Sequence, residues 1–180
     1  MSDLGRFLPL SQRKPGDESA VTSDRRAQTT DVIVAAAGVI AAAPPQQAST
    51  LARDFLTEAR LREDATPDEP GLLALAARVR DGRRRGIRSL AHTVRAYLLL
   101  TGRTGSAPHV PPQVTGAVAL YAATTAPLPR RAVVAGHTVR ATDDGWEFGR
   151  GPVLEGPGIQ IAAFLLAVSE VPPRTPGRNT

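Results

Sequence analysis

Residues 87–102, with the sequence IRSLAHTVRAYLLLTG, carry the clearest helical pattern of the chain. Apolar residues recur there every three or four positions, which places them on one face of an α-helix. We expect Gly102 to end this helix, because glycine favours the backbone conformation that stops one. The fold should therefore be built around a helix whose buried stripe is Ile87, Leu90, Ala91, Val94 and Leu98.

The same spacing predicts three helices before residue 87 and two after residue 102. The first is Ala-rich and covers residues 32–43, between Thr30-Asp31 and Pro44-Pro45. A fifth helix is expected over residues 112–125, after a proline-rich linker over 107–112. The apolar residues that define the second and third helices are Leu51, Phe55 and Ala59, then Leu72, Leu75, Ala76 and Val79.

Beyond residue 131 the pattern changes to the alternation of a β-strand. Residues 132–142 are rich in β-branched side chains, with His137, Val139 and Ala141 on one face. Asp143-Asp144-Gly145 is typical of a hairpin turn, which we take as a full explanation of these two aspartates.

The hairpin turn is followed by two aromatic residues and a glycine-rich bend. Trp146 and Phe148 lie two positions apart, so they share one side of a strand and should form a hydrophobic seam under the last helix. Gly149-x-Gly151 lacks the spacing of a dinucleotide-binding loop and indicates a turn instead. A short third strand over residues 153–155 and a final helix over 158–170 complete the pattern.

These elements predict a mainly α fold in two parts. A helical bundle covers residues 29–126, and a small α+β unit covers 127–172, with a β-hairpin or three-stranded meander and a closing helix. Residues 1–28 and 173–180 show no sustained periodicity and are predicted to be disordered tails.

The composition excludes several classes of site. The 180-residue chain contains no cysteine, so disulfides, iron–sulfur clusters and thiol nucleophiles are ruled out. Its three histidines, His92, His109 and His137, are not at metal-ligand spacing.

The most apolar run, residues 32–43, is shorter than the roughly 18 residues that a membrane-spanning helix needs. The first 28 residues do not resemble a signal peptide, so we expect a soluble, cytoplasmic protein.

The positive charge of the chain is concentrated in one region. Lys14 is the only lysine among 22 basic residues, a bias typical of a GC-rich genome. Seven arginines and one aspartate lie between Arg78 and Arg95, while the whole chain carries a net charge of only +5. This patch could bind nucleic acid or an anionic small molecule or partner, or could simply be solvated. Few aromatic residues accompany it, which disfavours nucleic acid.

Two motifs in the second half of the chain support a family resemblance. Residues 89–95 read SLAHTVR and are followed by Leu100-Thr101-Gly102. Residues 140–146 read RATDDGW, and 149–157 read GRGPVLEGP before an apolar helix. With these motifs, residues 87–172 resemble the mycothiol-dependent maleylpyruvate isomerase family of the DinB-like superfamily. The resemblance implies a helical bundle followed by a small α/β domain.

The resemblance also implies a metal-dependent activity. Family members hold a divalent metal, usually zinc, with one early histidine and with a Glu and a His four residues apart on a later helix, and they catalyse thiol-dependent isomerisation or transfer. His92 matches the later histidine, whereas Arg88 stands four residues before it and Arg95 three after it. No histidine precedes His92, so it is the one candidate metal ligand or acid–base residue.

The sequence therefore leaves two main hypotheses. The first is a mycothiol-dependent small-molecule isomerase or transferase with a degenerate metal site at His92. The second is a non-catalytic binding or interaction module of the same fold. In either case the partner is a small molecule or a protein, and the candidate anion-binding residues are Arg83, Arg84, Arg85, Arg88 and Arg95.

Overall fold

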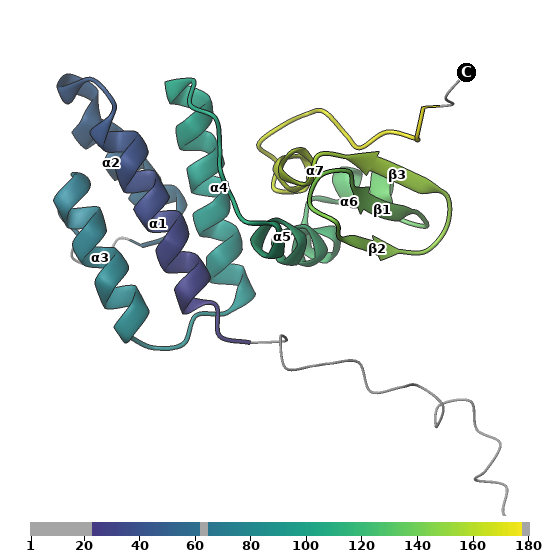
Figure 1. Cartoon of the computed structure of the whole chain (residues 1–180), viewed down its shortest axis with the longest axis horizontal. Coiled ribbons are helices and arrows are strands. Elements are labelled where there is room, and N and C mark those ends of the chain that lie inside the picture. The colour runs from purple at the N-terminus through teal and green to yellow at the C-terminus, as the bar shows by residue number, and fades with distance from the viewer. Residues whose placement is uncertain (1–22, 62–64, 178–180) are drawn as a thin grey trace, which may run out of the picture.

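The computed structural model describes residues 23–61 and 65–177, and Figure 1 shows their arrangement. Four helices form the first part: α1 (Arg26–Ala41), α2 (Pro45–Glu58), α3 (Glu69–Asp81) and α4 (Ile87–Thr104). Helix α1 packs most extensively against α3 and α4, and α2 packs against α4. The apolar stripes predicted for the second, third and fourth helices are buried, apart from Ile87, which is partly buried. The mainly helical fold is thus confirmed.

Helix α1 begins earlier than its sequence pattern predicts. Residues 26–28, which the sequence assigns to a tail, are helical, and residues 1–22 of that tail lie outside the described residues. The backbone amide of Arg26 donates to the Asp24 carboxylate at 3.1 Å, and the amide of Arg25 donates to the carbonyl of Arg85 at 2.6 Å. The first contact is local, whereas the second ties the start of the helix to a distant loop that local periodicity does not reveal.

Helix α4 runs past Gly102, contrary to the sequence prediction, and ends at Gly105. Gly105 has a φ of 68°, the left-handed conformation that commonly ends a helix. Gly102 is exposed inside the helix, between the buried Thr101 and Arg103, which forms an ion pair with Asp54 of α2. Helix α4 contacts α1, α2 and α5, so it is buried on more than the one predicted stripe.

Helix α5 (Pro112–Thr125) matches the predicted range and joins the two parts of the molecule. Val114 and Val118 belong to the core of the four-helix part, whereas Ala119 and Ala122 belong to a second, smaller core. Helices α6 (Leu128–Val134) and α7 (Gly158–Leu165) and a three-stranded sheet complete that second core (Figure 1). Helix α6 takes up residues that the sequence pattern assigns partly to a strand.

The sheet contains the predicted hairpin, but its third strand does not continue as a meander. Strand β1 (Thr138–Ala141) is central and pairs antiparallel with β2 (Glu147–Gly149) and parallel with β3 (Val153–Gly156). Gly149 and Gly151 have φ values of 90° and 125°, and a Cβ on Gly151 would lie 2.0 Å from the carbonyl oxygen of Gly136. These glycines let the chain pass closely around the start of β1 to its other edge.

Helix α7 is shorter than the predicted range of 158–170 and ends at Leu165. The guanidinium group of Arg130 donates to the carbonyl oxygens of Phe164 at 2.6 Å and Ser169 at 2.5 Å, and Ala167 has a φ of 58°. A side chain from α6 thus satisfies the carbonyls that a longer helix would use. Beyond α7, Arg174 pairs with Glu155 of β3 in an isolated β-bridge. The segment predicted to be a disordered tail, residues 173–180, therefore starts in contact with the sheet. Its residues 178–180 lie outside the described residues.

Within residues 23–61 and 65–177, no helix combines the length and the apolar character needed to cross a membrane.

Candidate anion-binding site

A cavity of about 530 Å³ lies where the four-helix part meets the second core. We call it the His92 cavity. Its charged residues come from the end of α2 and the first half of α4, and the other walls come from α5, α7 and the segments after these two helices. These residues are Arg60, Arg88, His92 and Arg95, opposite Tyr121, Ala122, Leu165 and Leu166.

His92 lies half-buried on α4, on the flank of the stripe that faces the core. Its Nε2 atom is buried and has no hydrogen-bond partner among the described residues. Burial lowers the pKa of His92 from its ordinary value of 6.5, because a low-dielectric environment disfavours the charged ring. The three arginines of the cavity lower this pKa further, and the Glu58 carboxylate partly opposes them. His92 is therefore a neutral imidazole near neutral pH.

The three arginines of the cavity differ in their bonding. Arg95 forms an ion pair with Glu58 and donates from Nε to the carbonyl oxygen of Leu166 at 3.2 Å. It therefore ties α4 to α2 and to the end of α7. Arg60 and Arg88 are exposed, and neither guanidinium group bonds to the residues that the structure describes. These two arginines are available to an anion.

Arg60 reaches the cavity because α2 ends in an unusual conformation. Arg60 has a φ of 57°, a left-handed conformation that is uncommon for residues other than glycine. The amide of Leu61 bonds back to the carbonyl of Leu56 at 3.0 Å, and Leu61 itself is 3% exposed. Burial of Leu61 thus turns Arg60 outward. The sequence around Arg60 contains no glycine or motif that signals this turn.

The residues around His92 do not fit the zinc site that the family resemblance implies. Arg88 and Arg95 occupy the positions on the same helix from which a ligand would reach the ion. Among residues 23–61 and 65–177, no three His, Cys, Asp or Glu residues are grouped so that they could hold a metal. The other two histidines do not line the His92 cavity, and the ring of His137 contacts the Ala135 carbonyl through Nδ1 at 3.0 Å.

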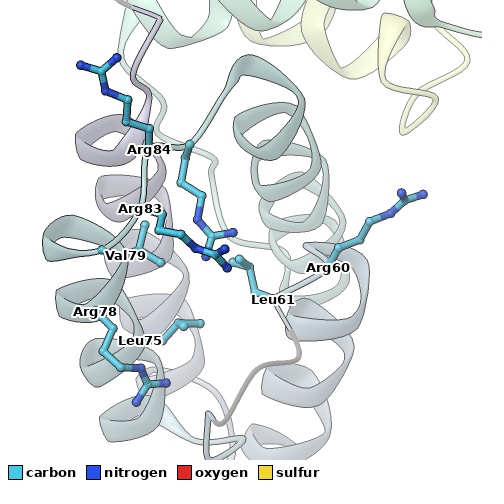
Figure 2. Close-up of a pocket in the computed structure, with 9 residues that line it drawn as sticks. Arg60, Leu61, Leu75, Arg78, Val79, Arg83 and Arg84 are labelled. Atoms are coloured by element: carbon cyan, nitrogen blue, oxygen red, sulfur yellow. The ribbon is translucent and has the colours of Figure 1, made fainter.

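The structure divides the predicted arginine patch between two places. Arg88 and Arg95 join His92, whereas Arg83, Arg84 and Arg85 line a different cavity of about 400 Å³ between α3 and the end of α2. We call this the loop cavity, and Figure 2 shows it. Arg60 lines both cavities, and its side chain points away from Arg83.

The two aspartates of the hairpin have contacts that the turn pattern does not explain. Asp143 accepts a hydrogen bond from the amide of Gly158 at 2.7 Å, at the start of α7. Asp144 bonds the hydroxyl of Thr115, to which Trp146 Nε1 also donates at 3.1 Å. These bonds connect the hairpin to both α5 and α7, so their role is structural.

The aromatic pair lies on the same side of the sheet, as predicted. The rings of Trp146 and Phe148 stack with centroids 5.8 Å apart. Both residues pack against the smaller core that α5 and α7 share. Trp146 also covers α5 at Gly116, where a Cβ would lie 2.9 Å from its Cδ1 atom.

No family model matches the chain, and neither a curated protein nor a solved structure was found to match it.

Proposed function

We propose that the chain binds a small organic anion with an apolar body in the His92 cavity. The observation that carries this proposal is that one cavity is lined by two arginines without described partners, Arg60 and Arg88, and by the neutral ring of His92. Cavities of this size, lined by apolar walls and a few polar groups, are typical of small-molecule sites. This proposal corresponds to the hypothesis of a non-catalytic binding module, with the His92 cavity as the binding site.

The chemistry of the lining favours a carboxylate. A guanidinium group presents a planar pair of donors that matches a carboxylate. Arg60 and Arg88 would hold the negative group, and neutral His92 would exchange one hydrogen bond with the ligand. The walls from α5 and α7 would cover the rest of the molecule, where each buried CH₂ group contributes about 0.8 kcal/mol.

Phthalate is a suitable probe because it combines two carboxylates with an apolar ring. We expect saturable binding by calorimetry and no binding of its neutral ester, dimethyl phthalate. Loss of a hydrogen bond to a charged group costs about 1.5–3 kcal/mol. Arg88→Gln should therefore weaken phthalate binding by about tenfold or more, which corresponds to roughly 1.4 kcal/mol or more.

Arg53→Gln is the matched control, because Arg53 is exposed on α2 and lines neither cavity. Equal weakening by Arg88→Gln and Arg53→Gln would show a diffuse charge effect and contradict the proposal. Equal affinity for phthalate and its ester would contradict it as well.

A second candidate is that the bound anion is a substrate. The observation that favours it is the lowered pKa of His92, which keeps the ring available as a general base at neutral pH. The resemblance suggests thiol-dependent isomerisation, with mycothiol as the cofactor. Incubation of unsaturated dicarboxylates with and without mycothiol, followed by NMR, would reveal it as product formation that His92→Gln abolishes. Equal product with His92→Gln would exclude this role.

A further inference from the structure

We infer that the loop cavity is a second site, specific for a small molecule that carries several phosphate groups. Five arginines line its roughly 400 Å³, and no acidic residue is among its described lining residues. Arg60 is the one lining residue that this site shares with the His92 cavity, and the inference rests on the other arginines, so it does not depend on the function proposed above. The arginines are Arg60, Arg78, Arg83, Arg84 and Arg85.

The loop that carries the central arginines is held in place by the segment before α1. The amide of Arg25 donates to the Arg85 carbonyl at 2.6 Å, and the amide of Arg85 lies 3.4 Å from the Asp24 carboxylate. The guanidinium group of Arg26 donates to the carbonyl oxygen of Gly82 at 2.6 Å. Both ends of residues 82–85 are thus anchored, and an anchored loop loses less conformational entropy when it binds a ligand.

The floor of the loop cavity is apolar. Leu61, Leu75 and Val79 are each less than 5% exposed and lie beneath the arginines. In Figure 2 the Arg83 side chain extends over this floor toward Leu61, while Arg84 and Arg78 point outward on either side of it. Arg83 is thus the labelled arginine that reaches across the floor, while Arg60, Arg78 and Arg84 lie around the rim of the cavity.

This arrangement fits clustered phosphates better than the alternatives. Arginine binds phosphate oxygens through paired hydrogen bonds, and five arginines that line one cavity favour a ligand with concentrated negative charge. Single-stranded nucleic acid binds through aromatic side chains on which its bases stack, and the described lining contains none. A volume of about 400 Å³ suits a small molecule rather than a duplex.

Titration with sodium tripolyphosphate at constant ionic strength tests this inference. We expect saturable binding by calorimetry and a rise in melting temperature, because a ligand that binds only the folded state stabilises it. The double variant Arg83→Gln/Arg84→Gln should weaken tripolyphosphate binding by at least tenfold. The control Arg53→Gln/Arg80→Gln removes the same charge from exposed residues that do not line the cavity, and it should change the affinity less than threefold.

Equal weakening by the two double variants would overturn the inference, since binding would then follow net charge alone. Tighter binding of a 20-base-pair DNA duplex than of tripolyphosphate, lost in Arg83→Gln/Arg84→Gln, would also overturn it in favour of nucleic acid. Phthalate binding should be unchanged in Arg83→Gln/Arg84→Gln, and tripolyphosphate binding unchanged in His92→Gln. Failure of one site is thereby distinguishable from failure of the other.

Discussion

His92 combines partial burial with a buried ring nitrogen that has no described partner. Its environment is set by residues that are close in the fold but not all close in the sequence. Arg88 and Arg95 lie within one turn of His92 on α4, so the sequence places them near the ring. Arg60 joins them only because α2 ends in a left-handed residue and Leu61 is buried. The sequence thus named His92, Arg88 and Arg95 as candidate site residues, but not Arg60.

The lowered pKa of His92 makes the stability of the protein depend on pH. The unfolded chain binds a proton at His92 more readily than the folded chain, so the stabilisation is complete above the unfolded pKa of about 6.5. It is lost as the pH falls below that value. We expect the melting temperature to fall between pH 7.5 and pH 5.5 more in the wild type than in His92→Gln. Equal decreases in melting temperature for the two proteins would show that folding does not disfavour the charged form of the His92 ring.

At the level of single elements, local periodicity predicted every described helix except α6, but it predicted the helix ends poorly. The positions of buried stripes follow from the sequence, because a helix that packs on a core needs apolar residues at regular spacing. The ends depend on distant partners: Arg85 at the start of α1 and Arg130 at the end of α7. The parallel pairing of β3 likewise depends on the close passage at Gly151, which no alternation of side chains encodes.

Two glycine substitutions test this description of the helices. Gly102→Ala lies inside α4 with no atom within 4 Å of the added Cβ, so we expect it to stabilise the protein by about 0.5–1 kcal/mol. Gly116→Ala would place a Cβ 2.9 Å from Trp146, and we expect a net destabilisation of roughly 1–3 kcal/mol. Urea unfolding of both variants gives the comparison. Destabilisation by Gly102→Ala would mean that α4 ends at that glycine after all.

Over the whole molecule, α5 determines where the His92 cavity can form. It belongs to both cores, so it holds the sheet and α7 against the four-helix part, and the His92 cavity lies at that junction. The sequence predicted both parts and the basic patch but not the junction. The His92 cavity forms where residues 60, 92 and 166 come together, and no local sequence pattern predicts contacts between residues so far apart in the chain. The division of the arginines into two sites follows from the same packing.

The most direct test of the central claim is an NMR titration of the three histidine rings with phthalate. An anion held by Arg60 and Arg88 would offset the positive charges that lower the pKa of His92, so this pKa should rise on binding. His109 and His137 do not line the cavity and serve as internal references. We predict saturable shifts and a higher pKa for His92 alone. No change at His92, or equal changes at all three rings, would contradict the proposal that the cavity binds an organic anion.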